Sequence, residues 1–179
     1  MIFSLAKIDD VDAFADALIS ELSEDGKTLA FDADSLKAIL KSFDDPAQEP
    51  ISVESAVGDL GGNYKAYRSN GKETSDPDLS EYHFLCAFEQ LELQNGQSVD
   101  RYGNPQPFEV TAFYPALADV KAEEINDIMM MIFDPTSGEM ALIQLDSSSL
   151  DTGKTPPELK VTLPFAGLFT FIQKEEIKE

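Results

Sequence analysis

Residues 128–145 read Ile-Met-Met-Met-Ile-Phe-Asp-Pro-Thr-Ser-Gly-Glu-Met-Ala-Leu-Ile-Gln-Leu. Two apolar runs flank a segment of turn-forming residues, which predicts a β-hairpin that joins residues 128–133 to residues 140–145. Consecutive residues of a strand face opposite sides of a sheet. Because Met129, Met130 and Met131 are all apolar, we expect a central strand that is covered on both faces.

The strand pattern continues on both sides of this hairpin. Leu159, Val161 and Leu163 alternate with Lys160 and Thr162, as in a strand with one solvated face. Further strands are predicted for residues 108–114 and 165–172, and turns are predicted at Asn70-Gly71, Asn95-Gly96 and Tyr102-Gly103-Asn104-Pro105. Residues 79–93 fit either a helix that follows Asp76-Pro77 or a strand; their alternation favours a strand.

The first third of the chain has a helical pattern instead. Apolar residues recur at spacings of three and four behind the candidate caps Asp9 and Asp10, at Val11, Phe14, Ala15, Leu18, Ile19 and Leu22. Gly26 is expected to end this helix. A second helix carries Leu36, Ile39, Leu40 and Phe43, begins at Asp32, Asp34 or Ser35 and stops before Pro46. A short third helix is predicted from Val53 to Leu60, with Gly61 and Gly62 as its terminator.

These patterns together predict an α+β fold, with an N-terminal helix pair followed by a mainly antiparallel β-sheet. A chain of 179 residues has the usual size of one domain. We therefore expect a single domain over residues 1–179, with a helical segment at about 9–60 and a strand-rich segment at about 63–172.

The net charge is the most unusual property of the sequence. There are 34 acidic and 13 basic residues, which leave a formal charge of −21 and an isoelectric point near 4.1, while 42% of the residues are hydrophobic, as in a folded domain. Nucleic acids and anionic membranes bind through Lys and Arg, so both are excluded as expected partners. Basic proteins and metal cations would be attracted instead.

Cysteine content and hydropathy bear on the compartment. Cys86 is the only cysteine, so no internal disulfide is expected. The first residues show no signal-peptide pattern, and no apolar run approaches the roughly 18 residues that a membrane helix needs. The sequence therefore predicts a cytoplasmic protein.

The acidic residues are concentrated near the N-terminus, where residues 1–60 hold 14 acidic and 4 basic residues. Asp12, Asp16 and Glu24 lie in one row at helical spacing. Asp12 and Asp16 repel each other, so local helix stability does not explain the row. We expect it to be a partner-binding surface made of Asp9, Asp12, Asp16, Glu24 and Asp25. The alternative is a solvated face that only keeps the protein soluble.

Two metal sites are possible in the same region. The segment Leu29-Ala30-Phe31-Asp32-Ala33-Asp34 resembles the Asp-x-Asp nucleophile motif of haloacid-dehalogenase-type phosphatases, although Leu36 replaces the hydroxyl residue expected after the second Asp. The resemblance implies a Mg²⁺-dependent phosphoesterase that uses Asp32 and Asp34. The simpler interpretation is that one of these residues caps the second helix.

A calcium-loop register also fits this region, with Glu21, Ser23, Asp25, Gly26 and Asp32 at positions 1, 3, 5, 6 and 12. It lacks the usual Asp at position 1 and the usual Glu at position 12. An ordinary loop after the first helix is the favoured interpretation, and no metal or other cofactor is predicted.

Residues for nucleophilic catalysis are scarce. His83 is the only histidine, and it lies three positions before Cys86 within an apolar run. Structural zinc sites need about four Cys or His ligands. We expect both residues to serve core packing, and we predict no catalytic residue.

The leading hypothesis is an acidic intracellular binding or inhibitor protein that sequesters a basic protein, in the manner of an immunity protein or a nucleic-acid mimic. The first alternative is the Mg²⁺-dependent enzyme. The second is that the acidity is an adaptation to salt or a solubility device, with the function on an apolar surface.

Overall fold

The computed structural model describes residues 3–8, 10–23, 31–43, 51–62, 64–93, 102, 107–135 and 138–174. Its α-helices are α1 (Val11–Ser23), α2 (Ala33–Ser42) and α3 (Val53–Asp59). Its strands are β1 (Phe3–Lys7), β2 (Tyr64–Arg68), β3 (Glu73–Thr74), β4 (Tyr82–Phe84), β5 (Glu89–Leu93), β6 (Phe108–Phe113), β7 (Ile128–Asp134), β8 (Glu139–Gln144), β9 (Leu150–Asp151), β10 (Glu158–Leu163) and β11 (Gly167–Lys174). Short 3-10 helices are η1 (Leu79–Glu81), η2 (Pro115–Leu117) and η3 (Ala122–Asp127).

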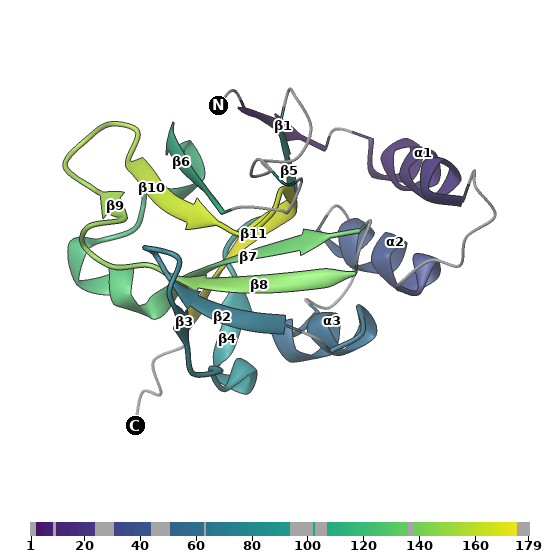
Figure 1. Cartoon of the computed structure of the whole chain (residues 1–179), viewed down its shortest axis with the longest axis horizontal. Coiled ribbons are helices and arrows are strands. Elements are labelled where there is room, and N and C mark those ends of the chain that lie inside the picture. Colours follow the sequence, from purple (N-terminus) through teal and green to yellow (C-terminus); the bar gives the residue numbers. More distant parts are fainter. Residues whose placement is uncertain are drawn as a thin grey trace.

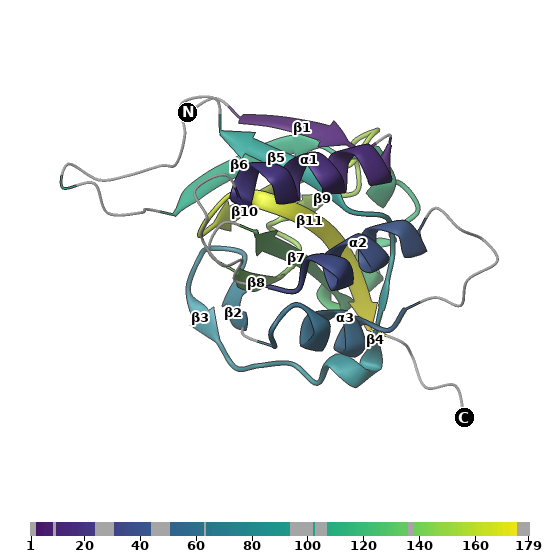
Figure 2. The ribbon, with the colours of Figure 1, turned by 90° about the vertical axis from the view of Figure 1, so that its right-hand side faces the viewer.

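The elements form three layers (Figure 1). The middle layer is an eight-stranded sheet in the order β1-β5-β11-β7-β8-β2-β3, with β4 also paired to β11. Figure 2 shows the three α-helices in front of one face of this sheet. A three-stranded sheet, β6-β10-β9, packs on the other face. The α+β class with its mainly antiparallel sheet is confirmed.

Strand β7 lies between two hydrophobic cores. Met129, Met131 and Phe133 face the helices, whereas Met130 and Ile132 face the small sheet. All seven residues of β7 are buried, so the prediction of a strand covered on both faces is correct. The predicted hairpin is also confirmed, because β7 pairs antiparallel with β8 through a turn in which Gly138 donates its amide to the Asp134 carbonyl at 2.8 Å.

Local capping interactions explain where the helices begin. The Asp10 carboxylate accepts the Ala13 amide at the start of α1, and Asp32 accepts the Asp34 amide at the start of α2. Ser52 caps α3 in the same way. These bonds satisfy amides that have no partner within the helix. The predicted third helix and its glycine terminator are confirmed, since Gly62 has a φ of 72° and donates its amide to the Val57 carbonyl at 2.9 Å.

The strand-rich half follows its predicted turns where the structure describes them. Gly71, with a φ of 90°, closes the turn between β2 and β3. Residues 79–93 form η1, β4 and β5, so the choice of a strand over a long helix is correct for most of that stretch. The turn predicted at Asn95-Gly96 lies outside the described residues, as does most of the one predicted at residues 102–105.

Two features of the topology differ from the predicted order of helices first and sheet second. Strand β1 precedes α1 and pairs with β5, and β2 pairs parallel with β8. Both pairings join segments that are far apart in the sequence, so no local pattern reports them. None of the helices in the described part of the chain has the length and apolar character needed to cross a membrane.

Candidate partner-binding surface

The predicted acidic row lies on α1, beside α2. Asp12 and Asp16 have exposed side chains, at 55% and 67% of their full accessibility. Asp9, Glu24 and Asp25 lie outside the described residues. The structure therefore places two of the five predicted partner-binding residues.

Lysine side chains of α2 face these two carboxylates. Lys37 Nζ lies 3.1 Å from Asp16 and 3.7 Å from Asp12, and Lys41 Nζ lies 2.9 Å from Asp12. The hydrogen bond from Lys41 lowers the pKa of the Asp12 carboxyl below its ordinary value, and the bond to Asp16 raises the pKa of Lys37. Asp12 and Asp16 therefore link α1 to α2 through exposed ion pairs, a tertiary contact that the helical spacing of the row does not predict.

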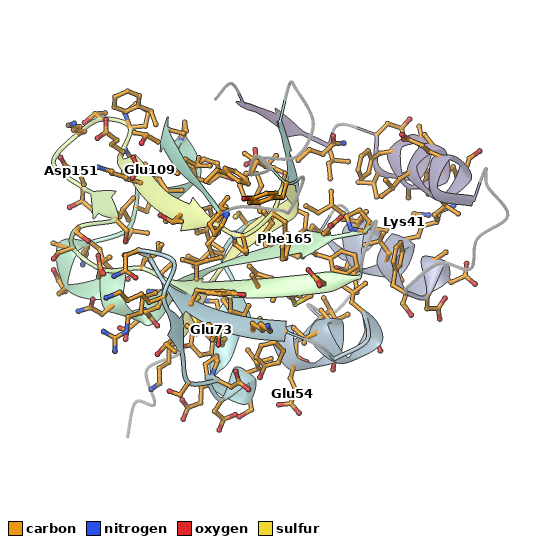
Figure 3. All side chains as sticks on the ribbon, in the orientation of Figure 1. Lys41, Glu54, Glu73, Glu109, Asp151 and Phe165 are labelled. Atoms are coloured by element: carbon orange, nitrogen blue, oxygen red, sulfur yellow. The ribbon has the colours of Figure 1, made fainter. Side chains whose placement is uncertain are left out.

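The helical layer still carries a large excess of exposed negative charge. In the described part of α1, α2, α3 and their caps, two lysines, Lys37 and Lys41, accompany eight exposed acidic residues: Asp10, Asp12, Asp16, Glu21, Asp32, Asp34, Glu54 and Asp59. Figure 3 shows Glu54 projecting from α3 away from the rest of the molecule. Lysines of α2 thus neutralise only a minority of this charge, which leaves an anionic surface called here the acidic helical face.

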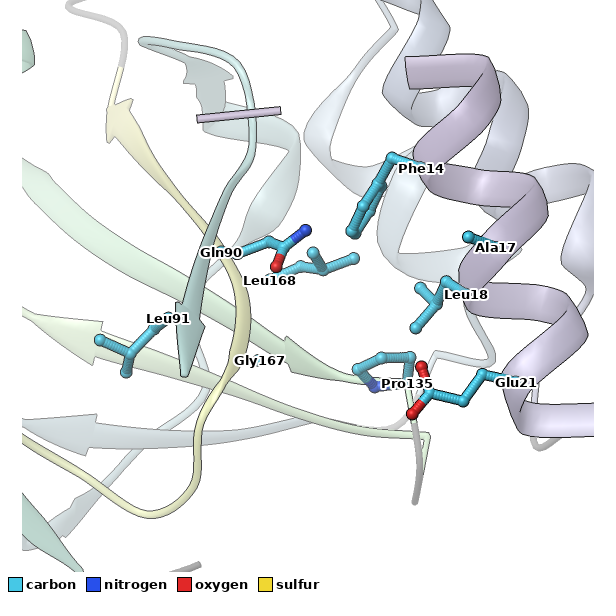
Figure 4. Close-up of a pocket in the computed structure, with 9 residues that line it drawn as sticks. All are labelled: Phe14, Ala17, Leu18, Glu21, Gln90, Leu91, Pro135, Gly167 and Leu168. Atoms are coloured by element: carbon cyan, nitrogen blue, oxygen red, sulfur yellow. The ribbon is translucent and has the colours of Figure 1, made fainter. Parts of the chain in front are cut away.

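A groove of about 300 Å³ lies between α1 and the large sheet (Figure 4), on the flank of α1 opposite Asp12. Asp12 and Glu21 are nine residues apart, which places them about 180° apart around the helix. The residues that line the groove include Phe14, Leu18 and Glu21 of α1, Gln90 of β5, and Gly167 and Leu168 of β11.

The groove exists because α1 covers this part of the sheet incompletely. Val11 and Ala15 are buried, but Phe14 and Leu18 are only partly buried against the core. Gly167 presents no side chain to the groove. A Cβ at this position would lie 2.2 Å from the Phe133 carbonyl oxygen, so the close approach of β11 to β7 requires glycine there.

Two polar side chains interrupt the apolar lining. Leu91 is buried between the sheets, so its neighbour Gln90 faces the helices, and Figure 4 shows the Gln90 amide directed into the groove. The Glu21 carboxylate lies at one end, near Pro135. Among the described residues, neither side chain has an ion pair or a hydrogen-bond partner.

A larger hollow of about 660 Å³ lies at the other edge of the large sheet, along β2. Its lining combines Tyr64 and Tyr67 with Asp76, Glu139 and Lys65. Lys65 Nζ lies 3.9 Å from Glu73, another carboxylate of this edge. Lys65 therefore offsets part of the negative charge of this hollow.

The residues of the possible Mg²⁺ site serve helix capping. One Asp32 oxygen accepts the Asp34 amide at 3.0 Å, and the other accepts the Ser35 hydroxyl at 3.2 Å. Within the described residues, no group of three His, Cys, Asp or Glu side chains could hold a metal ion. Most of the calcium-loop register, including Asp25 and Gly26, lies outside the described residues.

Cys86 is packed between the two sheets, as the sequence predicted. Its Sγ lies 3.4 Å from the hydroxyl of buried Thr170, which donates to the Cys86 carbonyl at 2.7 Å. Burial raises the pKa of the Cys86 thiol, which disfavours the nucleophilic thiolate. His83 lies in β4, opposite Gln173 of β11.

Sequence reasoning missed the groove and its two polar residues. A signal for Glu21 was present, because Phe14, Leu18 and Glu21 are spaced by four and three and so share one face of α1. A carboxylate that continues an apolar row indicates an opening in the packing. Gln90 had no comparable signal, since the covering of its strand by α1 depends on the tertiary fold.

Comparison of the chain with protein-family models, with curated proteins and with solved structures found no match.

Proposed function

We propose that this chain is a cytoplasmic binding protein whose acidic helical face docks against the basic surface of a partner protein. Its action would be that of an immunity protein or a nucleic-acid mimic, which covers Lys and Arg side chains of the protein it inhibits. The proposal rests on one observation: eight exposed carboxylates and only two lysines occupy the helical layer of the described chain.

The expected mechanism has two stages. The field of the chain, with a net charge of −21, first attracts a basic protein over a distance comparable to the Debye length, about 10 Å at 0.1 M salt. Carboxylates of the acidic helical face then pair with cations of the partner. Long-range attraction affects mainly the association rate, so that rate should fall steeply as salt is added.

The test uses neutralising substitutions that leave the α1–α2 ion pairs intact. The variant Asp34→Asn, Glu54→Gln, Asp59→Asn removes three exposed carboxylates from the helical layer. The control variant is Glu109→Gln, Asp119→Asn, Glu123→Gln. It removes the same charge from exposed positions in β6 and in the segment between β6 and β7.

The tagged wild-type chain is first used to isolate the partner from its own cells, and association rates with the purified partner are then measured at low and high ionic strength. The helical variant should associate more slowly than the control variant at low ionic strength. Equal rates for the two variants would show that only net charge matters and would reject the acidic helical face as the docking surface.

The Mg²⁺-dependent phosphoesterase that would use Asp32 and Asp34 predicts metal binding. Calorimetry with millimolar Mg²⁺ and Ca²⁺ tests it, because neither heat nor a shift in melting temperature should be seen if Asp32 serves only as a helix cap. A stability that rises up to molar salt would favour the salt-adaptation hypothesis over partner binding.

A further inference from the structure

We propose that the groove between α1 and β11 is an anchor site for one basic side chain of the partner, an alkyl chain that ends in a cation. This inference rests on the proposed function, since it names the group of the partner that would be held at the edge of the acidic helical face, where Glu21 belongs to both the face and the groove.

The lining matches the two parts of such a side chain. Phe14, Leu18 and Leu168 offer apolar walls to the alkyl stem, and the carboxylate of Glu21 stands at one end, where the cation would lie (Figure 4). Lysine and arginine characteristically bury their stems along apolar surface and keep the charged end near water. Gln90 adds a polar group inside the groove, which disfavours a purely apolar occupant.

The size of the groove limits what can enter. Its volume of about 300 Å³ is at the lower end of the range for small-molecule sites. A single long side chain can occupy this space, whereas a helix or a folded element cannot. The rest of the partner would therefore lie over the neighbouring acidic helical face.

Charge identifies the source of the side chain. Glu21 has no ionic partner among the described residues, unlike Asp12 and Asp16, which face lysines on the opposite flank of α1. A second copy of this chain would bring another net charge of −21 and would be repelled at long range. A basic protein is the occupant that both the groove and the surrounding field favour.

The first experiment measures binding of small probes to the isotope-labelled chain by NMR. Butylguanidinium and butylammonium represent the ends of arginine and lysine, and butanol is the neutral control. Either cation should cause saturable shifts of the Gln90 side-chain amide and of α1 amides, with butanol at least several-fold weaker. The tighter cation identifies the preferred side chain. The absence of saturable shifts, or equal binding of butanol, would overturn the proposal.

Two variants then locate the contact. Glu21→Gln should weaken binding of the cationic probe about three- to tenfold, as expected for a charge-assisted contact near the surface. Ala17→Leu places a bulkier side chain at the exposed rim of the groove and should also weaken it. Glu54→Gln, an identical chemical change on α3, should have no effect. Probe binding that is unchanged in Glu21→Gln contradicts the anchor site.

The same variants separate this inference from the proposed function. With the isolated partner, Glu21→Gln and Ala17→Leu should accelerate dissociation. If only the three-residue helical variant impairs partner binding, the acidic helical face is the docking surface and the groove is not an anchor. If the probes bind but no helical substitution affects the partner, the proposed function fails and the groove remains a cation site.

Discussion

Replacing Gly167 by alanine gives the sharpest test of the fold around the groove. Gly167 is the first residue of β11, where that strand runs beside β7. A Cβ at this position would lie 2.2 Å from the Phe133 carbonyl oxygen and 2.9 Å from its carbonyl carbon. Both atoms belong to the backbone of a fully buried residue, so no side-chain rotation relieves the clash.

The expected loss in the free energy of unfolding depends on which atoms must move to make room for the new methyl group. Extra methyl groups in a packed core destabilise by about 1–3 kcal/mol when side chains can adjust. Here the backbone of β7 or β11 must shift, so we expect a loss of about 3 kcal/mol or more in the free energy of unfolding. For a chain of this size each kcal/mol lowers the melting temperature by roughly 2–4 °C, which predicts a drop of about 6–12 °C.

Gly58→Ala provides the matched control. Gly58 is an exposed residue of α3, and a Cβ there would meet no atom within 4 Å. Alanine is the better helix former by about 0.8–1 kcal/mol, so this variant should be slightly stabilised. Urea unfolding followed by circular dichroism measures both. A loss below about 1 kcal/mol for Gly167→Ala would refute the close approach of β11 to β7.

Three further substitutions and one labelling experiment test the core packing, the α2 cap, the hydrogen bonds of Asp146 and the buried thiol. Phe133→Ala should lower the free energy of unfolding by about 3–5 kcal/mol in urea titrations, because it empties the core beneath the helices. Asp32→Ala should cost about 1 kcal/mol by the same measurement, through loss of the α2 cap. Hydrogen bonds, that from Ser148 above all, lower the pKa of Asp146 below 3.8. The extra stability of the ionised carboxylate is therefore present above the ordinary pKa and lost as the pH falls through the folded pKa, so the cost of Asp146→Ala should be about 1–2 kcal/mol at neutral pH and smaller in strong acid. Native Cys86 should react slowly with a thiol reagent near pH 8 and rapidly in denaturant; rapid native labelling would contradict its burial.

The parts of the fold that sequence could predict are those with local signals. The three helices follow from apolar periodicity and capping residues such as Asp10, Asp32 and Ser52, and the β7–β8 hairpin follows from two apolar runs around a turn. The β1–β5 and β2–β8 pairings depend on distant segments. Their stability comes from the shared sheet, which no single stretch encodes.

The candidate surface was predicted only in part for the same reason. Its acidity is visible in the sequence, and Asp12 and Asp16 do share one exposed face of α1. Their pairing with Lys37 and Lys41 depends on how α1 and α2 pack, and that changes their role from a free charged row to a link between helices. The groove beside Glu21 is likewise a product of packing.

The position of β7 between two cores sets the order in which parts of the molecule can open. Removing either the helices or the small sheet exposes one face of the same strand, so amide hydrogens of β7 should exchange with solvent only through global unfolding. Among its described side chains, helix α1 buries only Val11 and Ala15 and otherwise packs through half-buried Phe14 and Leu18 and exposed ion pairs, so it should exchange through local opening. A bound partner would then be recorded as slower exchange in α1 with no change in β7.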